Sequence, residues 1–239
     1  MNAVAIITAR GGSKRIPGKN KKEFLGKPIL LYSIEAAIQS GMFEEVMVST
    51  DDLEIAELAV KAGAKLPFRR SEATSNDYAT TSEVLAEVFE KYRELGTEFT
   101  HACCIYPTAP FVTAKKLQDA MQRLVGEGAD CVMPVVRFSF PPQRGLVMQD
   151  GSLMYKWPEN RSVRTQDLEP FYHDVGQFYC FRVESFLRTG QVIEGKVLPI
   201  EVQDAEVQDI DEPSDWLLAE IKYKYMMENK LQSDGGQWA

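Results

Sequence analysis

Apolar residues along the first half of the chain follow two alternating patterns. Short apolar runs rich in β-branched residues are typical of strands buried on both faces, and they occur at residues 3–8, 46–49, 102–106 and 130–136. Longer segments carry apolar side chains at helical spacing, and they span residues 29–38, 51–62, 80–95 and 113–125. Strands that alternate with helices in this way predict an α/β fold with a doubly wound, mainly parallel sheet.

The pattern changes after residue 137. Over residues 138–181 the helical period is lost, and prolines, glycines and aromatic residues are frequent, so we expect a β-rich lobe inserted into the domain. Its predicted antiparallel strands lie at residues 146–148, 153–155 and 177–181. A last helix is predicted from residue 213 to about residue 228. The chain therefore reads as one domain over residues 1–230, followed by a mobile tail at 231–239.

The predicted sheet also indicates where a ligand would bind. In doubly wound sheets, ligands occupy the crevice at the carboxyl ends of the strands. We therefore expect the loops that follow Thr8, Val48 and Tyr106 to face one crevice.

Charge is distributed unevenly over the 239 residues. The chain has a net charge of -8, with 27 Lys and Arg against 35 Asp and Glu, which argues against a general nucleic-acid-binding protein. Residues 10–27 nevertheless hold seven basic residues and one acidic residue, Glu23. Such a concentrated cationic segment favours a small polyanionic ligand, although a solvated basic loop is the simpler alternative.

The patterns of cysteine, histidine and hydropathy argue against zinc-binding and membrane-spanning proteins. The four cysteines show no Cys-x-x-Cys spacing and only two histidines are present, so a zinc site is not expected. No segment reaches the roughly 20 apolar residues of a membrane helix. We therefore expect a cytoplasmic protein with reduced thiols and no membrane partner.

The basic segment begins with a glycine-rich loop, Arg10-Gly11-Gly12-Ser13-Lys14-Arg15-Ile16-Pro17-Gly18-Lys19-Asn20. Glycines let the backbone approach a ligand, and the amides and cations of such a loop can bind phosphate. The spacing differs from that of a P-loop, and Asn20 follows the lysine where a Ser or Thr would bind Mg²⁺. The loop also lacks the Gly-x-Gly-x-x-Gly dinucleotide pattern. It predicts a phosphate site whose metal ion is held elsewhere.

Two carboxylates near the end of the chain could hold that metal ion. Asp209 and Asp211 are separated by one residue, so in an extended segment both side chains leave the same face. Paired carboxylates bind hard cations such as Mg²⁺. A helix cap before Pro213 is the alternative interpretation.

The glycine-rich loop resembles the signature of nucleoside-triphosphate:sugar nucleotidyltransferases, and in detail that of the cytidylyltransferases that activate nine-carbon acidic (nonulosonic) sugars. The resemblance extends over nearly the whole chain. Within the family, the segments at residues 138–141, 157–160, 164–170 and 172–179 are most similar to enzymes that act on pseudaminic acid. The resemblance implies a Rossmann-like nucleotidyltransferase fold, CTP as nucleotide and Mg²⁺ as cofactor.

The resemblance also implies roles for individual residues. Arg10 and Lys19 match the cations that bind the triphosphate, and Asp209 and Asp211 match the metal ligands. The residues expected to bind the nucleotide are Ala9, Arg10, Gly11, Gly12, Ser13, Lys19, Asn20, Arg70 and Thr80. Thr80 is equally suited to cap a helix.

The acceptor sugar is expected to contact a polar and aromatic set, namely Tyr106, Arg164, Gln166, His173, Gln177 and Tyr179. Tyr106 stands where acetylneuraminate cytidylyltransferases usually carry Gln, which favours a sugar with different substituents. His173 could instead satisfy a turn, and the aromatic residues of the lobe could form a dimer contact. The resemblance implies a homodimer in which the lobe reaches the partner subunit.

These expectations combine into one reaction. The anomeric hydroxyl of pseudaminic acid attacks the α-phosphate of CTP, giving CMP-pseudaminic acid and pyrophosphate, with Arg10, Lys19 and Asp211 as the catalytic residues. Asp211 or a water molecule on the metal accepts the proton. Acetylneuraminate or another nonulosonic acid is the alternative acceptor. An Asp-x-Asp glycosyltransferase and a non-catalytic nucleotide-binding module are the alternatives from other classes.

Overall fold

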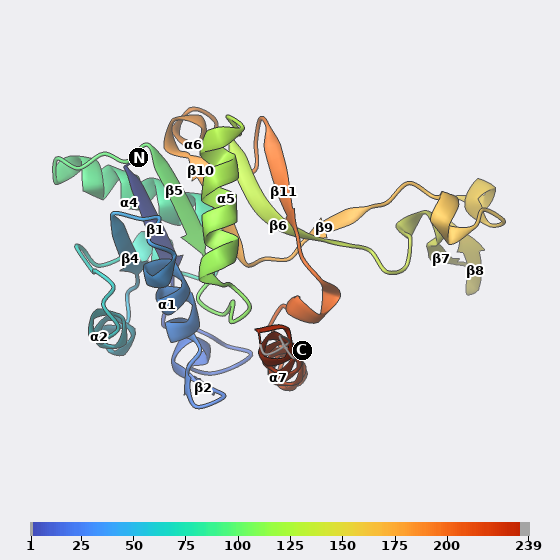
Figure 1. The fold of residues 1–239 in the computed structure, drawn as a ribbon, viewed down its shortest axis with the longest axis horizontal. Helices are drawn as coiled ribbons and strands as arrows, with labels where there is room; N and C mark the ends of the chain where they lie inside the picture. The colour runs from blue at the N-terminus through green and yellow to red at the C-terminus, as the bar shows by residue number, and fades with distance from the viewer. Residues whose placement is uncertain (1, 235–239) are drawn as a thin grey trace, which may run out of the picture.

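The computed structural model describes residues 2–234, with side chains up to residue 229, and its core is a mixed sheet (Figure 1). The sheet has seven strands, with the order β11-β6-β10-β5-β1-β4 and β9 paired to β6. Its strands are β1 (Ala3–Thr8), β4 (Glu45–Ser49), β5 (His101–Ile105), β6 (Cys131–Arg137), β9 (Tyr172–Asp174), β10 (Phe178–Arg182) and β11 (Val197–Glu201). The pairs β4–β1 and β1–β5 are parallel, as the alternation of strands and helices predicted. The pair β6–β11 is also parallel, although no strand was predicted at residues 197–201.

The helices cover both faces of this sheet. They are α1 (Leu30–Ser40), α2 (Leu53–Lys61), α3 (Glu72–Ser75), α4 (Thr81–Glu94), α5 (Ala114–Gly126), α6 (Val183–Thr189) and α7 (Pro213–Asp234). Helices α1, α2 and α5 pack on one face, and α4 and α6 pack on the other. No helix among residues 2–234 combines the length and the apolar composition needed to cross a bilayer.

Local sequence signals fix the ends of several of these helices. The side chain of Asp52 accepts hydrogen bonds from two backbone amides at the start of α2, and Thr113 caps α5 in the same way. Thr80 and Glu83 form a reciprocal capping box at the start of α4. Helix α1 ends at Gly41, whose φ of +64° suits glycine. These ends agree with the predicted boundaries.

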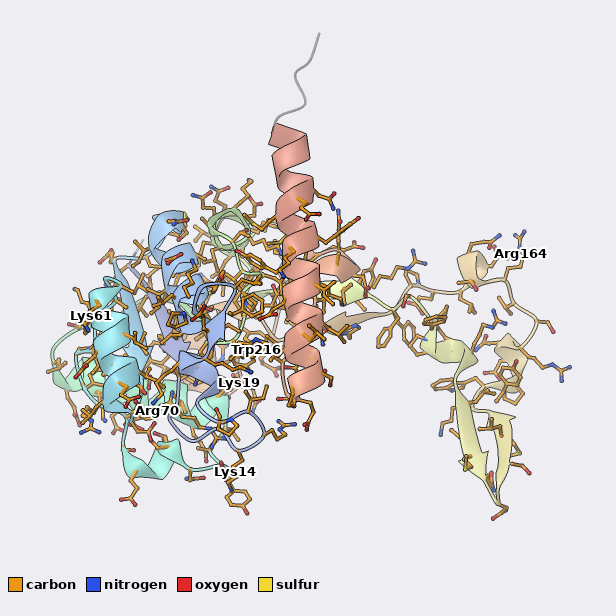
Figure 2. The ribbon with its side chains drawn as sticks, turned by 90° about the horizontal axis from the view of Figure 1, so that it is seen from below. Lys14, Lys19, Lys61, Arg70, Arg164 and Trp216 are labelled. Atoms are coloured by element: carbon orange, nitrogen blue, oxygen red, sulfur yellow. The ribbon has the colours of Figure 1, made fainter. Side chains whose placement is uncertain are left out.

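A lobe projects from the sheet at the position that the sequence indicates (Figures 1 and 2). The chain leaves at the end of β6 and returns as β9, which pairs antiparallel with residues 135–137 of β6. Farther out, β7 (Leu146–Gln149) and β8 (Ser152–Tyr155) form an antiparallel hairpin, as predicted. The lobe is therefore attached to the sheet through a two-stranded stalk.

The third strand predicted for the lobe belongs elsewhere. Residues 178–182 form β10, which lies in the centre of the sheet and runs antiparallel to both β5 and β6. The prediction that residues 177–181 pair within the lobe is therefore wrong. Burial of Phe178 and Cys180 on one face of the sheet and of Phe181 on the other explains their place in the core.

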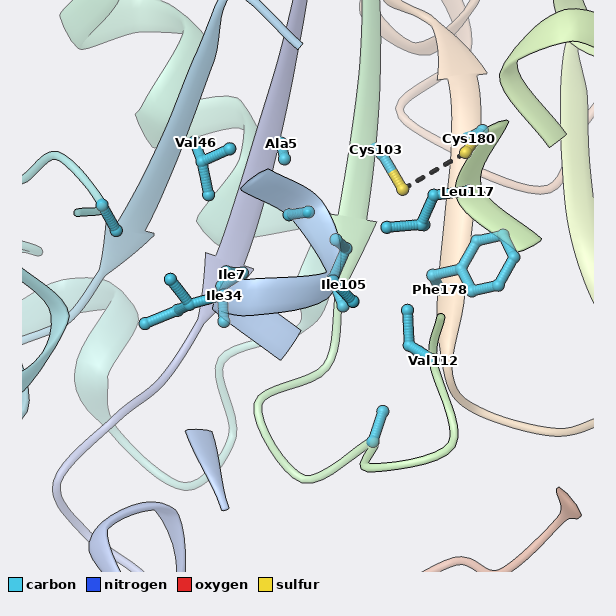
Figure 3. Close-up of a cluster of buried hydrophobic side chains, with 14 of the residues drawn as sticks. Ala5, Ile7, Ile34, Val46, Cys103, Ile105, Val112, Leu117, Phe178 and Cys180 are labelled. Carbon is cyan, nitrogen blue, oxygen red and sulfur yellow. Dashed lines mark hydrogen bonds between the residues drawn. The ribbon is translucent and has the colours of Figure 1, made fainter. Parts of the chain in front are cut away.

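The apolar core follows the alternation of side chains along each strand (Figure 3). Ala5 and Ile7 of β1 point to the face covered by α1, whereas Val4 and Ile6 point to the face covered by α4. The Sγ atoms of Cys103 and Cys180, on neighbouring strands, lie 3.2 Å apart, and all four cysteines are buried free thiols. The continuous apolar runs thus arise because the sheet is buried on both faces.

A third apolar cluster joins the two ends of the chain. It brings Ile16 of the glycine-rich loop and Phe24 of the small β2 (Glu23–Phe24) and β3 (Lys27–Pro28) hairpin against Ile210 and Trp216. The rings of Phe24 and Trp216 meet edge to face with centroids 5.6 Å apart. Helix α7 continues to Asp234, beyond the predicted end near residue 228, and the rest of the predicted tail lies outside the described residues.

Candidate functional site

A polar cavity of about 190 Å³ opens at the carboxyl ends of β1 and β5. It is lined by Thr8, Arg10, Ser13, Lys14, Arg15, Ile16, Lys19, Asn20, Tyr106, Pro107, Thr108 and Asp211. Four of these side chains are cationic and one is a carboxylate. The loops after Thr8 and Tyr106 therefore share one crevice, as expected, and its charge suits a polyanion. The loop after Val48, which was expected to face the same crevice, contributes no residue to its lining.

The glycine-rich loop is held in place by contacts of its own backbone. The side-chain amide of Asn20 donates to the carbonyl of Arg10, at 2.8 Å, and so closes the loop on itself. The amide of Gly11 donates to the Asp51 carboxylate at 2.9 Å. A Cβ on Gly11 would lie 2.9 Å from Oδ2 of Asp52, so this position requires glycine. The loop after β4 thus contacts and supports the glycine-rich loop.

Lys19 links the glycine-rich loop to residues 204–212, which precede α7 and are called the acidic segment below. Its Nζ donates to the carbonyl of Ile210 at 2.5 Å and lies 3.6 Å from Oδ1 of Asp211. Arg15 donates to the same oxygen at 2.8 Å. Ile16 and Ile210 belong to the same apolar cluster, which accounts for this meeting. The structure therefore brings the predicted triphosphate cation Lys19 and the predicted metal ligand Asp211 to one cavity.

Three side chains hold the acidic segment, two of them through its backbone and one through the Glu206 side chain. The amide of Gln177 donates to the carbonyl of Glu206 at 2.7 Å, and Lys222 of α7 donates to the carbonyl of Val207 at 2.7 Å. Lys116 of α5 forms an ion pair with Glu206 at 3.1 Å. The path of the chain toward Asp211 is thus fixed from three elements.

The acidic segment offers two carboxylates of the kind that bind Mg²⁺. Asp211 lines the cavity, whereas Asp209 is exposed and lies two residues before it. Within the part of the chain whose side chains are described, no cluster of three His, Cys, Asp or Glu side chains is arranged to hold a metal ion. Mg²⁺ commonly takes one or two carboxylates together with substrate phosphates and water, so a pair of carboxylates suffices.

Arg10 and Lys14 are bridged by a carboxylate that the sequence did not single out. Oδ1 of Asp77 accepts a hydrogen bond from Arg10 at 2.6 Å, and its other oxygen pairs with Lys14. The hydrogen bonds from Lys14 and Arg10 lower the pKa of Asp77. A cavity of about 190 Å³ is smaller than typical ligand pockets of about 300–1,000 Å³. We therefore expect these ion pairs to open when an anion enters.

Five residues predicted to bind the nucleotide do not line the cavity, namely Ala9, Gly11, Gly12, Arg70 and Thr80. Ala9 is fully buried, and its amide extends the β1–β4 pairing by donating to Ser49. The buried Arg70 donates to the hydroxyl and the carbonyl of Ser49, at 3.0 and 2.7 Å, and burial lowers the pKa of Arg70. The hydroxyl of Thr80 is engaged in the α4 capping box.

The predicted acceptor residues fall into two groups. Tyr106 lines the cavity, while Gln177 and Tyr179 are buried beneath it and bonded to protein groups. The other three lie on the stalk or lobe. The ring of His173 packs on Phe138, with centroids 4.7 Å apart.

Arg164 and Gln166 are exposed on the lobe, and Arg164 pairs with Asp167 there. Figure 2 shows Arg164 on the projecting lobe, away from Lys19 and Arg70 on the body. Within one chain, the structure does not bring these two residues to the cavity.

The residues missed by the sequence analysis are those that act through contacts distant in sequence. Asp51 and Asp77 contact the glycine-rich loop from segments 40 and 67 residues away. The local signal of Asp51 is its position after β4 and before α2, whereas Asp77 lies between α3 and α4. Lys14 and Arg15 belonged to the basic segment but were not assigned to the site, although both line the cavity.

A larger cavity of about 810 Å³ lies at the opposite end of the sheet, beside the start of β5 and the end of β10. Its walls are mainly apolar and include Phe89, Phe99 and Leu187. It contains none of the predicted site residues and lies far from the carboxyl ends of the parallel strands. The polar cavity is therefore the candidate active site.

Comparison with known proteins places this arrangement in context. The cytidylyltransferase sequence profile matches residues 4–156. The pseudaminic acid cytidylyltransferase of Campylobacter jejuni is 37% identical over 94% of this chain and 97% of its own. The CMP-N,N'-diacetyllegionaminic acid synthase of Legionella pneumophila is 31% identical over 92% and 95%, respectively. The fold matches a CMP:2-keto-3-deoxy-manno-octonic acid synthetase solved with CTP, with a TM-score of 0.68 at 20% identity, over 95% of this chain and 100% of the other.

Proposed function

Because the chain belongs to the cytidylyltransferase family, we propose that it transfers CMP from CTP to the anomeric hydroxyl of pseudaminic acid and releases pyrophosphate. One observation carries this proposal: Lys19 and Asp211, from the two ends of the chain, meet in one cationic cavity. The high similarity to pseudaminic acid cytidylyltransferases over almost the full length supports the choice of acceptor.

The cationic residues of the cavity suit this chemistry. When the sugar hydroxyl attacks the α-phosphorus in line, the O–P bond to the sugar forms and the bond to pyrophosphate breaks. Negative charge then gathers on the phosphoryl oxygens and on the leaving group. Arg10 and Lys19 line the cavity and would stabilise this charge, with Arg15 as a third cation. Fixed cations in such a site lower the barrier electrostatically.

We assign the metal site and the proton acceptor to the acidic segment. Asp209 and Asp211 would hold Mg²⁺, which when bound neutralises charge on the phosphate oxygens and orients them. The carboxylate of Asp211 lines the cavity, so Asp211 or a water molecule beside it is proposed to accept the proton of the sugar hydroxyl. Entry of the nucleotide phosphates would draw Arg15 and Lys19 from Asp211, leaving its oxygens available.

We propose a homodimer, because part of the acceptor site lies on the lobe. Arg164 and Gln166 would reach the cavity of a partner subunit, where the guanidinium of Arg164 would bind the sugar carboxylate. Exposed apolar side chains on the lobe support an interface there. They include Phe140, Met148 and Leu153, which are 86%, 76% and 64% exposed.

We further propose that the enzyme works in the cytoplasm. Four buried thiols remain free although Cys103 and Cys180 are neighbours, which agrees with a reducing compartment.

The experiment that tests this function measures pyrophosphate release with each of the four nucleoside triphosphates, with and without a panel of acid sugars. The proposal expects release only when CTP, Mg²⁺ and pseudaminic acid are all present. Preference for acetylneuraminate or a legionaminic acid would show that the acceptor is not pseudaminic acid, but it would leave CMP transfer from CTP as the reaction. Release from CTP without any sugar, or CTP binding without turnover, would contradict it.

A further inference from the structure

Tyr106 is the aromatic wall of the cavity, and it is held by neighbours from two other elements. Its hydroxyl lies 3.3 Å from the hydroxyl of Thr81, at the start of α4. Its ring meets the ring of Tyr179 edge to face, with centroids 5.8 Å apart. Its amide donates to the carbonyl of Gln177 at 2.9 Å. The position of this wall therefore depends on the segment that follows the lobe.

Tyr179 is in turn bound to the stalk of the lobe. It is 7% exposed, and its hydroxyl donates to Oδ2 of Asp174 at 2.5 Å. The other carboxylate oxygen of Asp174 accepts the amide of Gly176 at 2.8 Å. A buried phenol without an acceptor would be costly, so this bond fixes the Tyr179 ring.

Asp174 is placed where the lobe joins the sheet. It is the last residue of β9 and pairs with Val135 of β6, inside the two-stranded stalk. Gly176, with φ of +61°, turns the chain toward β10, and a Cβ there would lie 3.9 Å from the Tyr106 ring. A continuous series of side chains thus runs from the stalk through Tyr179 to the cavity wall.

We infer that Asp174 and Tyr179 are positioning residues that hold Tyr106 against the acceptor sugar and so set the affinity for it. This inference rests on the proposed function, because it assigns the Tyr106 side of the cavity to the sugar. The cations of the glycine-rich loop, which line the same cavity, would bind the triphosphate. Asp174 and Tyr179 should therefore affect sugar binding and leave CTP binding unchanged.

The protonation of both phenols agrees with this role. Burial raises the pKa of Tyr179, and the hydrogen bond to Asp174 raises it further, so the phenol remains a donor at neutral pH. Burial also raises the pKa of Tyr106.

The chain offers a matched control for the test. Tyr92 is a second buried tyrosine whose hydroxyl donates to a carboxylate, that of Glu45. This pair lies at the opposite end of the sheet, where β4 begins. Tyr92→Phe and Tyr179→Phe thus remove the same kind of bond and are expected to cost similar stability.

Steady-state kinetics separate an effect on sugar binding from an effect on CTP binding. We expect Tyr179→Phe and Asp174→Ala to raise the KM for the sugar about two- to tenfold, the range for one lost hydrogen bond. The KM for CTP and kcat should stay within about twofold, as should all three constants in Tyr92→Phe. Asp174→Asn keeps one acceptor oxygen where Asp174 has two, so it should raise the sugar KM less than Asp174→Ala. Unchanged sugar KM in Tyr179→Phe, or equal effects on sugar and CTP, would overturn the inference.

A double-variant comparison tests whether Tyr179 acts through Tyr106. In a Tyr106→Leu background, Tyr179→Phe should leave the sugar KM unchanged, because the ring that it positions is gone. A full additional effect in that background would mean that Tyr179 acts on the sugar by another route.

A readout without substrate separates failure of this inference from failure of the proposed function. The Tyr106 amide should exchange with deuterium faster in Tyr179→Phe than in the wild type or in Tyr92→Phe. If the Tyr106 amide exchanges faster in Tyr179→Phe but the enzyme uses no acid sugar, the proposed function and the sugar assignment are rejected. The contact by which Tyr179 positions Tyr106 is then still supported. Unchanged exchange would reject the positioning contact itself.

Discussion

The ammonium group of Lys19 lies 3.6 Å from the carboxylate of Asp211, although the two residues come from opposite ends of the chain. Packing of Ile16 and Phe24 against Ile210 and Trp216 holds the two segments together. The proposed triphosphate cation and the proposed metal ligand thus share one cavity.

Removal of the Lys19 charge should reduce turnover much more than stability. We expect Lys19→Met to lower kcat about 10²–10³-fold, as for loss of one preorganised group that stabilises transition-state charge. Lys115→Met is the matched control, because Lys115 is an exposed lysine of α5 paired with Asp119. Kinetics and thermal unfolding of both variants test this. A Lys19 variant with wild-type turnover would show that this cation has no catalytic role.

A methyl group at Gly11 should disturb the contact between the glycine-rich loop and Asp52. The added Cβ would meet Asp52, which caps α2 and also pairs with Lys21. We expect Gly11→Ala to lower the free energy of unfolding by about 1–3 kcal/mol. Gly12→Ala should leave it unchanged, because no atom lies within 4 Å of the new Cβ. Denaturant melts compare the two variants, and equal stabilities would show that the contact with Asp52 relaxes freely.

Asp77 should compete with the nucleotide for Arg10 and Lys14. In Asp77→Asn the triphosphate no longer displaces a carboxylate, so we expect the KM for CTP to fall about two- to fivefold. Asp119→Asn, which removes a remote surface carboxylate paired with Lys115, should have no effect. A higher KM for CTP in Asp77→Asn would mean instead that Asp77 orients the two cations for binding.

Glu87 should make stability depend on pH. Burial alone would raise its pKa, but hydrogen bonds from Lys91, Thr74 and Ser71 outweigh burial and lower it from 4.5 to about 2. A depressed pKa in the folded state adds stability above the unfolded value, and this contribution disappears as pH falls from about 4.5 to about 2.

Glu87→Gln should therefore cost about 1–3 kcal/mol at pH 7 and little at pH 2. Urea melts at both pH values, with Glu90→Gln on the exposed side of α4 as the control, measure this difference. A cost that persists unchanged at pH 2 would exclude the ionised carboxylate as its source.

Much of the fold follows from local patterns, and the exceptions have physical causes. The continuous apolar runs at β1, β4 and β5 and the caps of α2, α4 and α5 depend on neighbouring residues, so the sequence predicts them well. The direction of β10 is set by its partners β5 and β6, which no local pattern encodes. Strand β11 escaped prediction because it is a short, half-buried edge strand interrupted by Pro199.

Some residues of the candidate site could likewise be predicted from local sequence, and others could not. Arg10, Lys19 and Asp211 could be selected because a glycine-rich loop and an Asp-x-Asp pair have chemical meaning in themselves. Asp77 and Asp174 could not, since each acts through a partner that only the fold brings near. Gln177, expected to bind the sugar, instead donates to the segment that leads to Asp209.

We propose that the acidic segment supplies the metal ligands for a triphosphate held by the glycine-rich loop. The decisive test is pyrophosphate release by Asp209→Ala, with CTP, pseudaminic acid and a Mg²⁺ titration. Asp204→Ala in the same segment serves as the control. We expect Asp209→Ala to stay folded but to lose Mg²⁺-dependent release, whereas Asp204→Ala keeps it. Wild-type release by Asp209→Ala at every Mg²⁺ concentration would show that Asp209 is not a metal ligand.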